Sequence, residues 1–195
     1  TLAAIAHQVL ADKAVAVIAQ SPTYTQTELK EAQQVAKEIG IKHYITLTDE
    51  HDNPDFIKNP ENRCYFCKKE LLEKLKAFAH QHGFAVVFEG TNFSDLDMHR
   101  PGYQAVQEME KVYSPWVEAK FSKEEIRQVA RNLGLTVHDK PATACLASRI
   151  PFYEPITVER LRRVEDAENS IREVIKVKQL RVRDHNGIAR IEIGS

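Results

Sequence analysis

The three cysteines of this sequence are its best candidates for chemistry. Cys64 and Cys67 lie three positions apart, and Cys145 follows far downstream. Residues three apart share one helix face, and the positive N-terminal end of a helix favours thiolates, so this pair suits metal ligation or sulfur chemistry. Inert buried cysteines are the alternative. Zinc would need a fourth ligand, for which His99 and His138 are candidates, whereas three thiolates suffice for a [4Fe-4S] cluster with one open iron.

Cys145 also lies in a proline-containing loop between two cations, Lys140 and Arg149. Positive neighbours stabilise a thiolate and attract phosphate, so we expect a lowered thiol pKa and an anionic ligand at this loop. An ordinary charged surface loop is the alternative interpretation.

Two further groups of polar residues carry weaker signals. The segment 92–102 contains Asp95, Asp97, His99 and Arg100, which suit a metal or phosphate site or simply a solvated loop. Nearer the C-terminus, alternating arginines accompany two glutamates, a pattern typical of a solvated strand face. These residues are Glu168, Arg181, Arg183, Arg190 and Glu192.

Predicted strands and helices alternate along most of the chain. An apolar run over 14–19 is typical of a buried strand, and Thr25 to Glu28 forms a capping box before a helix that Gly40 ends. Similar patterns predict strands over 42–48 and 84–88 and helices over 65–82 and 122–132. The alternation predicts an α/β fold with a doubly wound, mostly parallel, Rossmann-like sheet, whose ligand crevice lies at the carboxyl ends of its strands. Glu89 to Asn92 follows one such strand.

The C-terminal part has a different pattern. A charged amphipathic helix over 157–174 precedes a hairpin with an Asn186-Gly187 turn, which indicates a smaller α+β unit. We therefore divide the sequence into a first domain, residues 1–150, and the beginning of a second domain, residues 151–195.

Composition narrows the class of protein. The 195 residues include 27 Lys and Arg against 28 Asp and Glu, so no overall positive field favours nucleic acid. No apolar run is long enough to cross a membrane, and an odd number of cysteines is typical of a reducing compartment. We expect a cytoplasmic protein without nucleic-acid or membrane partners.

Short motifs spread over nearly the whole sequence carry a resemblance. In order, they are NRCYFCKKELL, EGTN, HRPG, SPW, EIR, LGL, DKPATACLASRIP, RVEDAE, RVR and ARIE. With this order and spacing, the sequence resembles the LarE-type ATP-dependent sacrificial sulfur transferases of the PP-loop class, in a version with three cysteines. Members of that family adenylate a substrate carboxylate and then insert sulfur, as in the biosynthesis of the nickel-pincer nucleotide cofactor.

The resemblance implies an enzyme that uses ATP and Mg²⁺, takes a pyridinium-carboxylate mononucleotide as its small-molecule substrate and forms a homo-oligomer. It makes Cys145 the sulfur-handling catalytic residue, or makes Cys64, Cys67 and Cys145 together the ligands of a [4Fe-4S] cluster, with zinc as the alternative metal. It assigns cofactor and substrate binding to Glu89, Gly90, Thr91, Asn92, Lys140, Ser148, Arg149, Glu168, Arg181, Arg183 and Glu192.

One part of the family pattern is absent. The Ser-Gly-Gly-x-Asp-Ser loop that holds the ATP pyrophosphate does not occur in this sequence, and Thr1-Leu2 resembles the residues that follow it. We therefore expect a fragment that lacks this loop and the rest of the second domain. Another PP-loop enzyme, such as a tRNA thiolase or an amidotransferase-type synthase, and a non-catalytic metal-binding fragment are the alternative functions.

Overall fold

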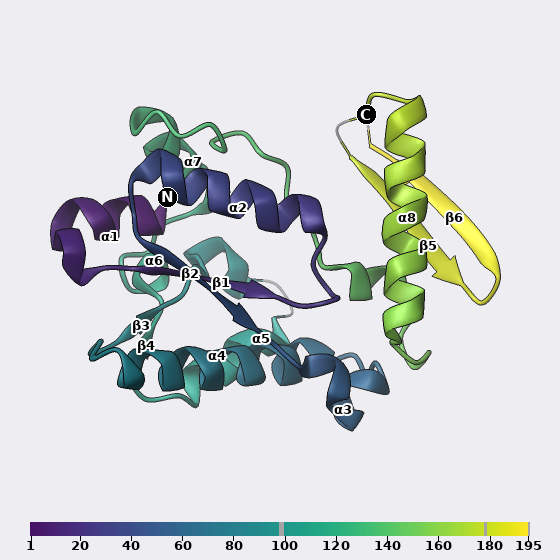
Figure 1. The fold of residues 1–195 in the computed structure, drawn as a ribbon, viewed down its shortest axis with the longest axis horizontal. Helices are drawn as coiled ribbons and strands as arrows, with labels where there is room; N and C mark the ends of the chain where they lie inside the picture. The colour runs from purple at the N-terminus through teal and green to yellow at the C-terminus, as the bar shows by residue number, and fades with distance from the viewer. Residues whose placement is uncertain (98–99, 178, 195) are drawn as a thin grey trace.

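The computed structural model describes residues 1–97, 100–177 and 179–194, which form a mixed α/β protein (Figure 1). The α-helices are α1 (Leu2–Leu10), α2 (Gln26–Ile39), α3 (Pro54–Ile57), α4 (Arg63–Gln81), α5 (Pro101–Gln107), α6 (Pro115–Glu118), α7 (Lys123–Asn132) and α8 (Val158–Val174). The strands are β1 (Ala16–Gln20), β2 (His43–Leu47), β3 (Val87–Phe88), β4 (Val112–Tyr113), β5 (Leu180–His185) and β6 (Ile188–Ile193), and short 3₁₀ turns include η2 (Glu50–Asp52) and η4 (Leu146–Arg149).

Capping residues explain where the main helices begin and end. The Thr25 side chain accepts a hydrogen bond from the Glu28 N–H at the start of α2, and Gly40 ends the helix with φ of 79°. At the start of α7, Ser122 and Glu125 satisfy each other's backbone N–H groups in a complete capping box. The predicted helices over these segments are confirmed.

The strands form short pairs. β1 and β2 are parallel, β3 and β4 are parallel, and β5 and β6 form an antiparallel hairpin. Helices α2 and α4 cover opposite faces of the β1–β2 pair (Figure 1), and Tyr44 of β2 contacts Phe78 of α4 with ring centroids 4.9 Å apart. Within the described residues these pairs do not join into one sheet.

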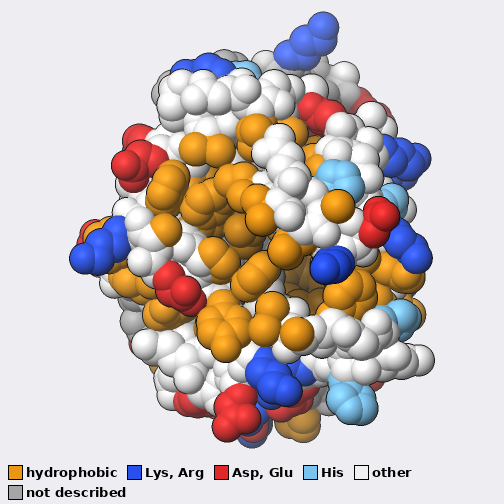
Figure 2. Space-filling model, turned by 90° about the vertical axis from the view of Figure 1, so that its left-hand side faces the viewer, with side chains coloured by type: hydrophobic (Ala, Val, Ile, Leu, Met, Phe, Trp, Pro, Cys, Tyr) orange, Lys and Arg blue, Asp and Glu red, His pale blue; other side chains and the backbone are white. Residues whose placement is uncertain are grey.

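Hydrophobic side chains remain exposed beside these short sheets. Figure 2 shows them gathered over a hollowed face, on the side of the molecule where α1, β3 and β4 lie. Phe88 of β3 and Tyr113 of β4 are register partners, and both are substantially exposed. The strand pairs therefore leave apolar surface without a covering layer among the described residues.

Helix α8 and the β5–β6 hairpin pack together beside the strand pairs (Figure 1). A buried hydrophobic cluster joins this unit to the rest, because Leu161 and Val164 of α8 pack with Phe56 of α3 and Leu146 of η4. The core thus crosses residue 150, and the division into two domains stays a prediction. No helix in the described ranges is long and apolar enough to span a membrane.

Candidate functional site

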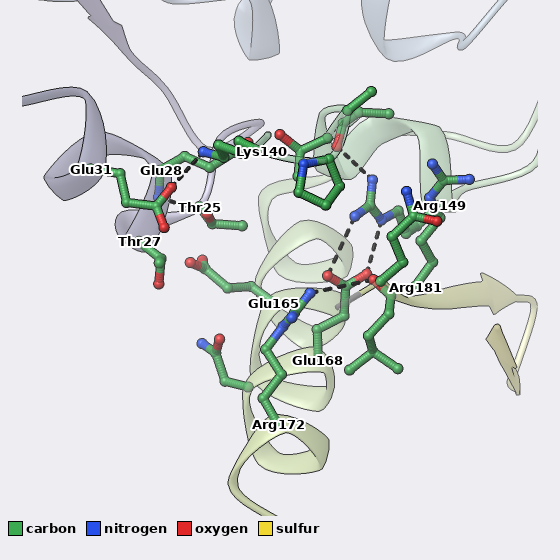
Figure 3. Close-up of a pocket in the computed structure, with 17 residues that line it drawn as sticks. Thr25, Thr27, Glu28, Glu31, Lys140, Arg149, Glu165, Glu168, Arg172 and Arg181 are labelled. Atoms are coloured by element: carbon green, nitrogen blue, oxygen red, sulfur yellow. Dashed lines mark hydrogen bonds and ion pairs between the residues drawn. The ribbon is translucent and has the colours of Figure 1, made fainter. Parts of the chain in front are cut away.

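A pocket of about 270 Å³ lies between the N-terminal end of α2, the loop 140–144 and the α8–β5 unit (Figure 3). Four of the residues with assigned binding roles line it, namely Lys140, Arg149, Glu168 and Arg181. Ala144, which directly precedes Cys145, lines it as well. The structure therefore brings together the Cys145 loop and part of the C-terminal charged cluster.

Arg149 and Glu168 form a buried ion pair at this pocket. The Arg149 Nε donates to Glu168 Oε1 at 2.9 Å, and the two side chains are only 5% and 6% exposed. Arg149 also donates to the Ala144 carbonyl at 2.6 Å, and Glu168 Oε1 accepts from the Val182 N–H at 3.0 Å. The pair thus ties the cysteine loop to α8 and β5.

Three further residues around the Cys145 loop, namely Lys140, Ser148 and Arg183, have hydrogen-bond partners outside the Arg149–Glu168 pair. Lys140 Nζ donates to Glu31 on α2 at 2.5 Å. Ser148 Oγ donates to the Cys145 carbonyl at 2.8 Å, and the Ser148 carbonyl accepts from Arg183 Nη1 at 3.0 Å. Ser148 therefore buttresses the loop and, like Arg183, does not line the pocket.

Arg183 and Glu192 pair across the β5–β6 hairpin. The Arg183 Nε donates to Glu192 Oε1 at 2.8 Å, and Arg190 contacts the same oxygen. These hydrogen bonds lower the pKa of Glu192 to about 2. Both residues thus stabilise the hairpin surface, whereas Arg181, their neighbour on β5, faces the pocket.

The segment 89–92 forms a second polar cluster, which does not line the pocket. Glu89 accepts hydrogen bonds from Lys68 Nζ at 2.8 Å, from the Thr91 hydroxyl at 2.8 Å and from Ser114. Burial by itself would raise the pKa of Glu89, but the Lys68 ammonium and the hydroxyl hydrogen bonds outweigh it, so this pKa is lowered. Asn92 is also buried, and its Oδ1 atom has no partner among the described residues. Gly90 lies between Glu89 and Thr91 in this segment.

The cysteines share one neighbourhood but differ in exposure. Cys67 and Cys145 pack against the same hydrophobic cluster, whereas Cys64 is exposed. Burial raises the pKa of Cys67, with help from the nearby Glu50 carboxylate. Burial also raises the pKa of Cys145, and the nearby cations Arg63 and Arg149 offset the rise only in part. The expectation of lowered thiol pKa values is therefore wrong for both partly buried cysteines: at Cys145 desolvation exceeds the effect of the positive neighbours, and at Cys67 desolvation and the nearby Glu50 carboxylate both raise the pKa.

Metal binding by the three cysteines stays a prediction. Within residues 1–97, 100–177 and 179–194, no three His, Cys, Asp or Glu side chains are arranged to hold a metal ion. The possible zinc ligand His99 lies outside the described residues. The other candidate, His138, has a buried Nδ1 atom without a hydrogen-bond partner in these ranges.

Sequence reasoning missed a buried acid beside the cysteines. Glu50 is 1% exposed, and its Oε1 atom accepts hydrogen bonds from the hydroxyls of Ser21, at 2.5 Å, and Thr23, at 2.8 Å. The Thr23 carbonyl in turn accepts from the Leu146 N–H at 2.8 Å, next to Cys145. Glu50 thus helps to position the cysteine loop, and its place just after β2 was the available signal.

Comparisons with known proteins place the chain in a family. No protein-family model matches it. It is 46% identical to the uncharacterized protein slr1717 of Synechocystis sp. over 98% of its residues and 71% of that protein. It is 32% identical to the uncharacterized protein MJ0830 of Methanocaldococcus jannaschii over 91% of its residues and 67% of that protein.

The third relative has a named activity. The chain is 33% identical to the pyridinium-3,5-bisthiocarboxylic acid mononucleotide synthase of Lactiplantibacillus plantarum, the LarE protein. This match covers 93% of the chain but 65% of the synthase, so the chain spans less than two thirds of that relative's length. With these identities over nearly its whole length, the chain belongs to the same family as the slr1717 and MJ0830 proteins, and its similarity to the synthase supports a LarE-like family.

Proposed function

We propose that this protein is an ATP-dependent sulfur transferase that activates a substrate carboxylate by adenylation and then inserts sulfur into it, as in nickel-pincer nucleotide cofactor biosynthesis. The observation that carries the proposal is the pocket beside the Cys145 loop, which Arg149 ties to the α8–β5 unit. The relationship to a synthase of a pyridinium bisthiocarboxylic mononucleotide supports this choice of substrate class.

The sulfur-transfer step is assigned to Cys145. ATP converts the substrate carboxylate to an acyl adenylate with release of pyrophosphate, and bound Mg²⁺ would supply charge neutralisation at the phosphates. The Cys145 sulfur attacks the acyl carbon, and AMP leaves as the thioester forms. Loss of the Cys145 Cα proton and cleavage of its Cβ–S bond release the thiocarboxylate and leave dehydroalanine. Because burial raises the pKa of this thiol, it stays protonated until a base removes its proton at the time of attack.

Metal at the cysteines is a separate part of the proposal. Cys64, Cys67 and Cys145 supply thiolates, the donors that iron–sulfur clusters use, but the described side chains do not form a ready metal-binding group. The sulfur-transfer step assigned to Cys145 therefore needs no metal at the cysteines. A [4Fe-4S] cluster, with zinc as the alternative, is tested by iron, zinc and acid-labile sulfide assays on anaerobically purified protein. Metal-free protein with three free thiols would exclude both.

ATP is assigned to the carboxyl ends of the parallel strand pairs. In an open parallel sheet, ligands bind in the crevice at the carboxyl ends of the strands, and β1–β2 and β3–β4 are both parallel pairs. Glu89 is occupied by its neighbours, so it fixes the loop containing Thr91 and Asn92. The unpaired Asn92 Oδ1 then accepts a hydrogen bond from the adenine amino group.

The proposal also includes a cellular location and an oligomeric state. Three free cysteines support a cytoplasmic location. Exposed isoleucines on the edge strand β6, namely Ile188, Ile191 and Ile193, support a homo-oligomer. Light scattering coupled to gel filtration measures the latter, and a monomer at micromolar concentration would contradict it.

Replacing Cys145 by Ser in the intact protein tests the chemistry. We expect pyrophosphate release from ATP and the carboxylate substrate to continue, because adenylation precedes the cysteine step, while thiocarboxylate formation stops. In the wild type, one sulfur transferred per chain with a mass loss of about 34 Da marks Cys145 as the source of the sulfur. Undiminished sulfur transfer by the serine variant would refute the assignment. Cys64→Ser is the matched control, because single-cysteine chemistry does not need it.

A further inference from the structure

The four cations among the described residues that line the pocket, namely Lys140, Arg149, Arg172 and Arg181, are not equivalent. Lys140 is paired with Glu31, and Arg149 is paired with Glu168. By contrast, neither Arg172 nor Arg181 forms an ion pair with any carboxylate of the described ranges; Arg172 makes only a long contact, 3.5 Å, from Nη2 to the Leu180 carbonyl. Two guanidinium groups of the pocket therefore remain available to an anion.

These two arginines come from adjacent elements. Arg172 is in the last turn of α8, and Arg181 is the second residue of β5. Figure 3 shows both near the Arg149–Glu168 pair, while Glu28 and Glu31 lie toward the opposite end of the pocket. The buried Glu168 carboxylate binds the Val182 N–H, which fixes β5 against α8 and so fixes the spacing of the two arginines.

The α8 face between these ends is also polar. Glu165 and Arg172 lie two helical turns apart and line the same pocket. Glu165 Oε1 accepts a hydrogen bond from the Gln26 N–H at 2.9 Å, so this carboxylate already occupies the N-terminal end of α2. A ligand anion is therefore repelled from the α2 end and attracted to the Arg172–Arg181 end.

We propose that Arg172, together with Arg181, binds the phosphate of the mononucleotide substrate, whereas Lys140 and Arg149 do not. This inference rests on the proposed function, and it names a residue that the sequence motifs did not indicate. Guanidinium groups bind phosphate through two parallel N–H donors, so a pair of open arginines recognises a phosphate monoester better than either paired cation does. The pocket, close to the small end of the range for ligand sites, about 300 Å³, suits one mononucleotide.

Binding of two matched probes tests the inference. The probes are nicotinic acid mononucleotide and nicotinic acid riboside, which differ only in the phosphate, and the measurement is calorimetric titration of the 195-residue chain. We expect the wild type to prefer the mononucleotide at least about tenfold, Arg172→Gln to lose most of that preference, and Arg172→Lys to lose part of it, because lysine keeps the charge without the two-donor geometry. Riboside binding should not change in either variant.

Two controls keep the test specific. Arg162→Gln removes an exposed arginine from the same helix that does not line the pocket, and Lys140→Gln removes a paired cation; each should keep the wild-type ratio of the two dissociation constants. A wild type with no preference for the mononucleotide, or an unchanged ratio in Arg172→Gln, overturns the inference. Intact phosphate preference in a protein that transfers no sulfur would instead refute the proposed function and leave this site standing.

Discussion

Two glutamates, Glu89 and Glu168, are buried to a similar extent but form hydrogen bonds with different kinds of partner. Glu89 is bound by Lys68, Thr91 and Ser114, so its network is closed and the pocket does not reach it. Glu168 binds Arg149 and the β5 backbone at the edge of the pocket. The comparison indicates that the Glu89 cluster, whose hydrogen bonds are all made within the protein, stabilises the fold. The Glu168 cluster instead positions the residues of a binding pocket.

The largest expected effect comes from breaking the buried pair at the pocket. Arg149→Ala or Glu168→Ala should each lower the free energy of unfolding by about 3–5 kcal/mol, because each leaves a buried charge without its partner. The double change Arg149→Met with Glu168→Leu should cost less than the worse single change, since it leaves no unpaired charge. Urea unfolding of the four proteins measures this. If the free energy of unfolding of both single variants lies within about 1 kcal/mol of the wild-type value, the buried pair does not stabilise the fold.

A smaller effect on stability is expected at the polar cluster around Glu89. Glu89→Gln keeps the shape but removes the ion pair with Lys68, and we expect a loss of about 2 kcal/mol at neutral pH. The pKa of Glu89 is lowered by folding, so its contribution is complete above the pKa of the unfolded chain, about 4.3, and disappears as the pH falls through the folded pKa.

Denaturant unfolding of wild type and Glu89→Gln from pH 7 down to acid checks this dependence. The difference between the two proteins should shrink on acidification. A difference that stays constant would mean that the charge of Glu89 does not contribute. Sulfur transfer by Glu89→Gln should fall only as far as the loop with Thr91 and Asn92 loosens, because Glu89 itself contacts no substrate in the proposal.

Local signals in the sequence predicted the elements well, and long-range contacts explain the differences. Thr25 and Gly40 fixed the ends of α2 because caps depend on neighbouring residues only. The predicted strand over 84–88 shortened to Val87–Phe88, because β4 offers only two paired residues. Strand pairing is set by a distant partner, which periodicity does not reveal.

At the candidate site, too, local motifs predicted which residues are involved, whereas long-range contacts determine what each of them does. Motifs indicated Arg149, Glu168 and Arg181, and all three line the pocket. The motifs did not separate their roles, since burial and pairing with distant residues decide which arginine is a brace and which is open. Arg172 had no motif, and only the packing of α8 against β5 brings it to the pocket.

The smallest expected effect is at the hairpin, where the Arg–Glu pairing is exposed. The pKa of Glu192 is about 2, because the side chains of Arg183 and Arg190 hydrogen-bond to it. Arg183→Gln should raise this pKa toward the ordinary glutamate value, and Arg190→Gln should raise it less, since the Arg190 side chain is 56% exposed and that of Arg183 is 25% exposed. Carboxyl carbon NMR titration measures both shifts. Stability should hardly change in either variant, because solvent screens an exposed pair, in contrast to the buried pair at the pocket. A large stability loss in Arg183→Gln would instead point to its second contact, the Ser148 carbonyl, as the important one, and would make this arginine part of the brace on the Cys145 loop.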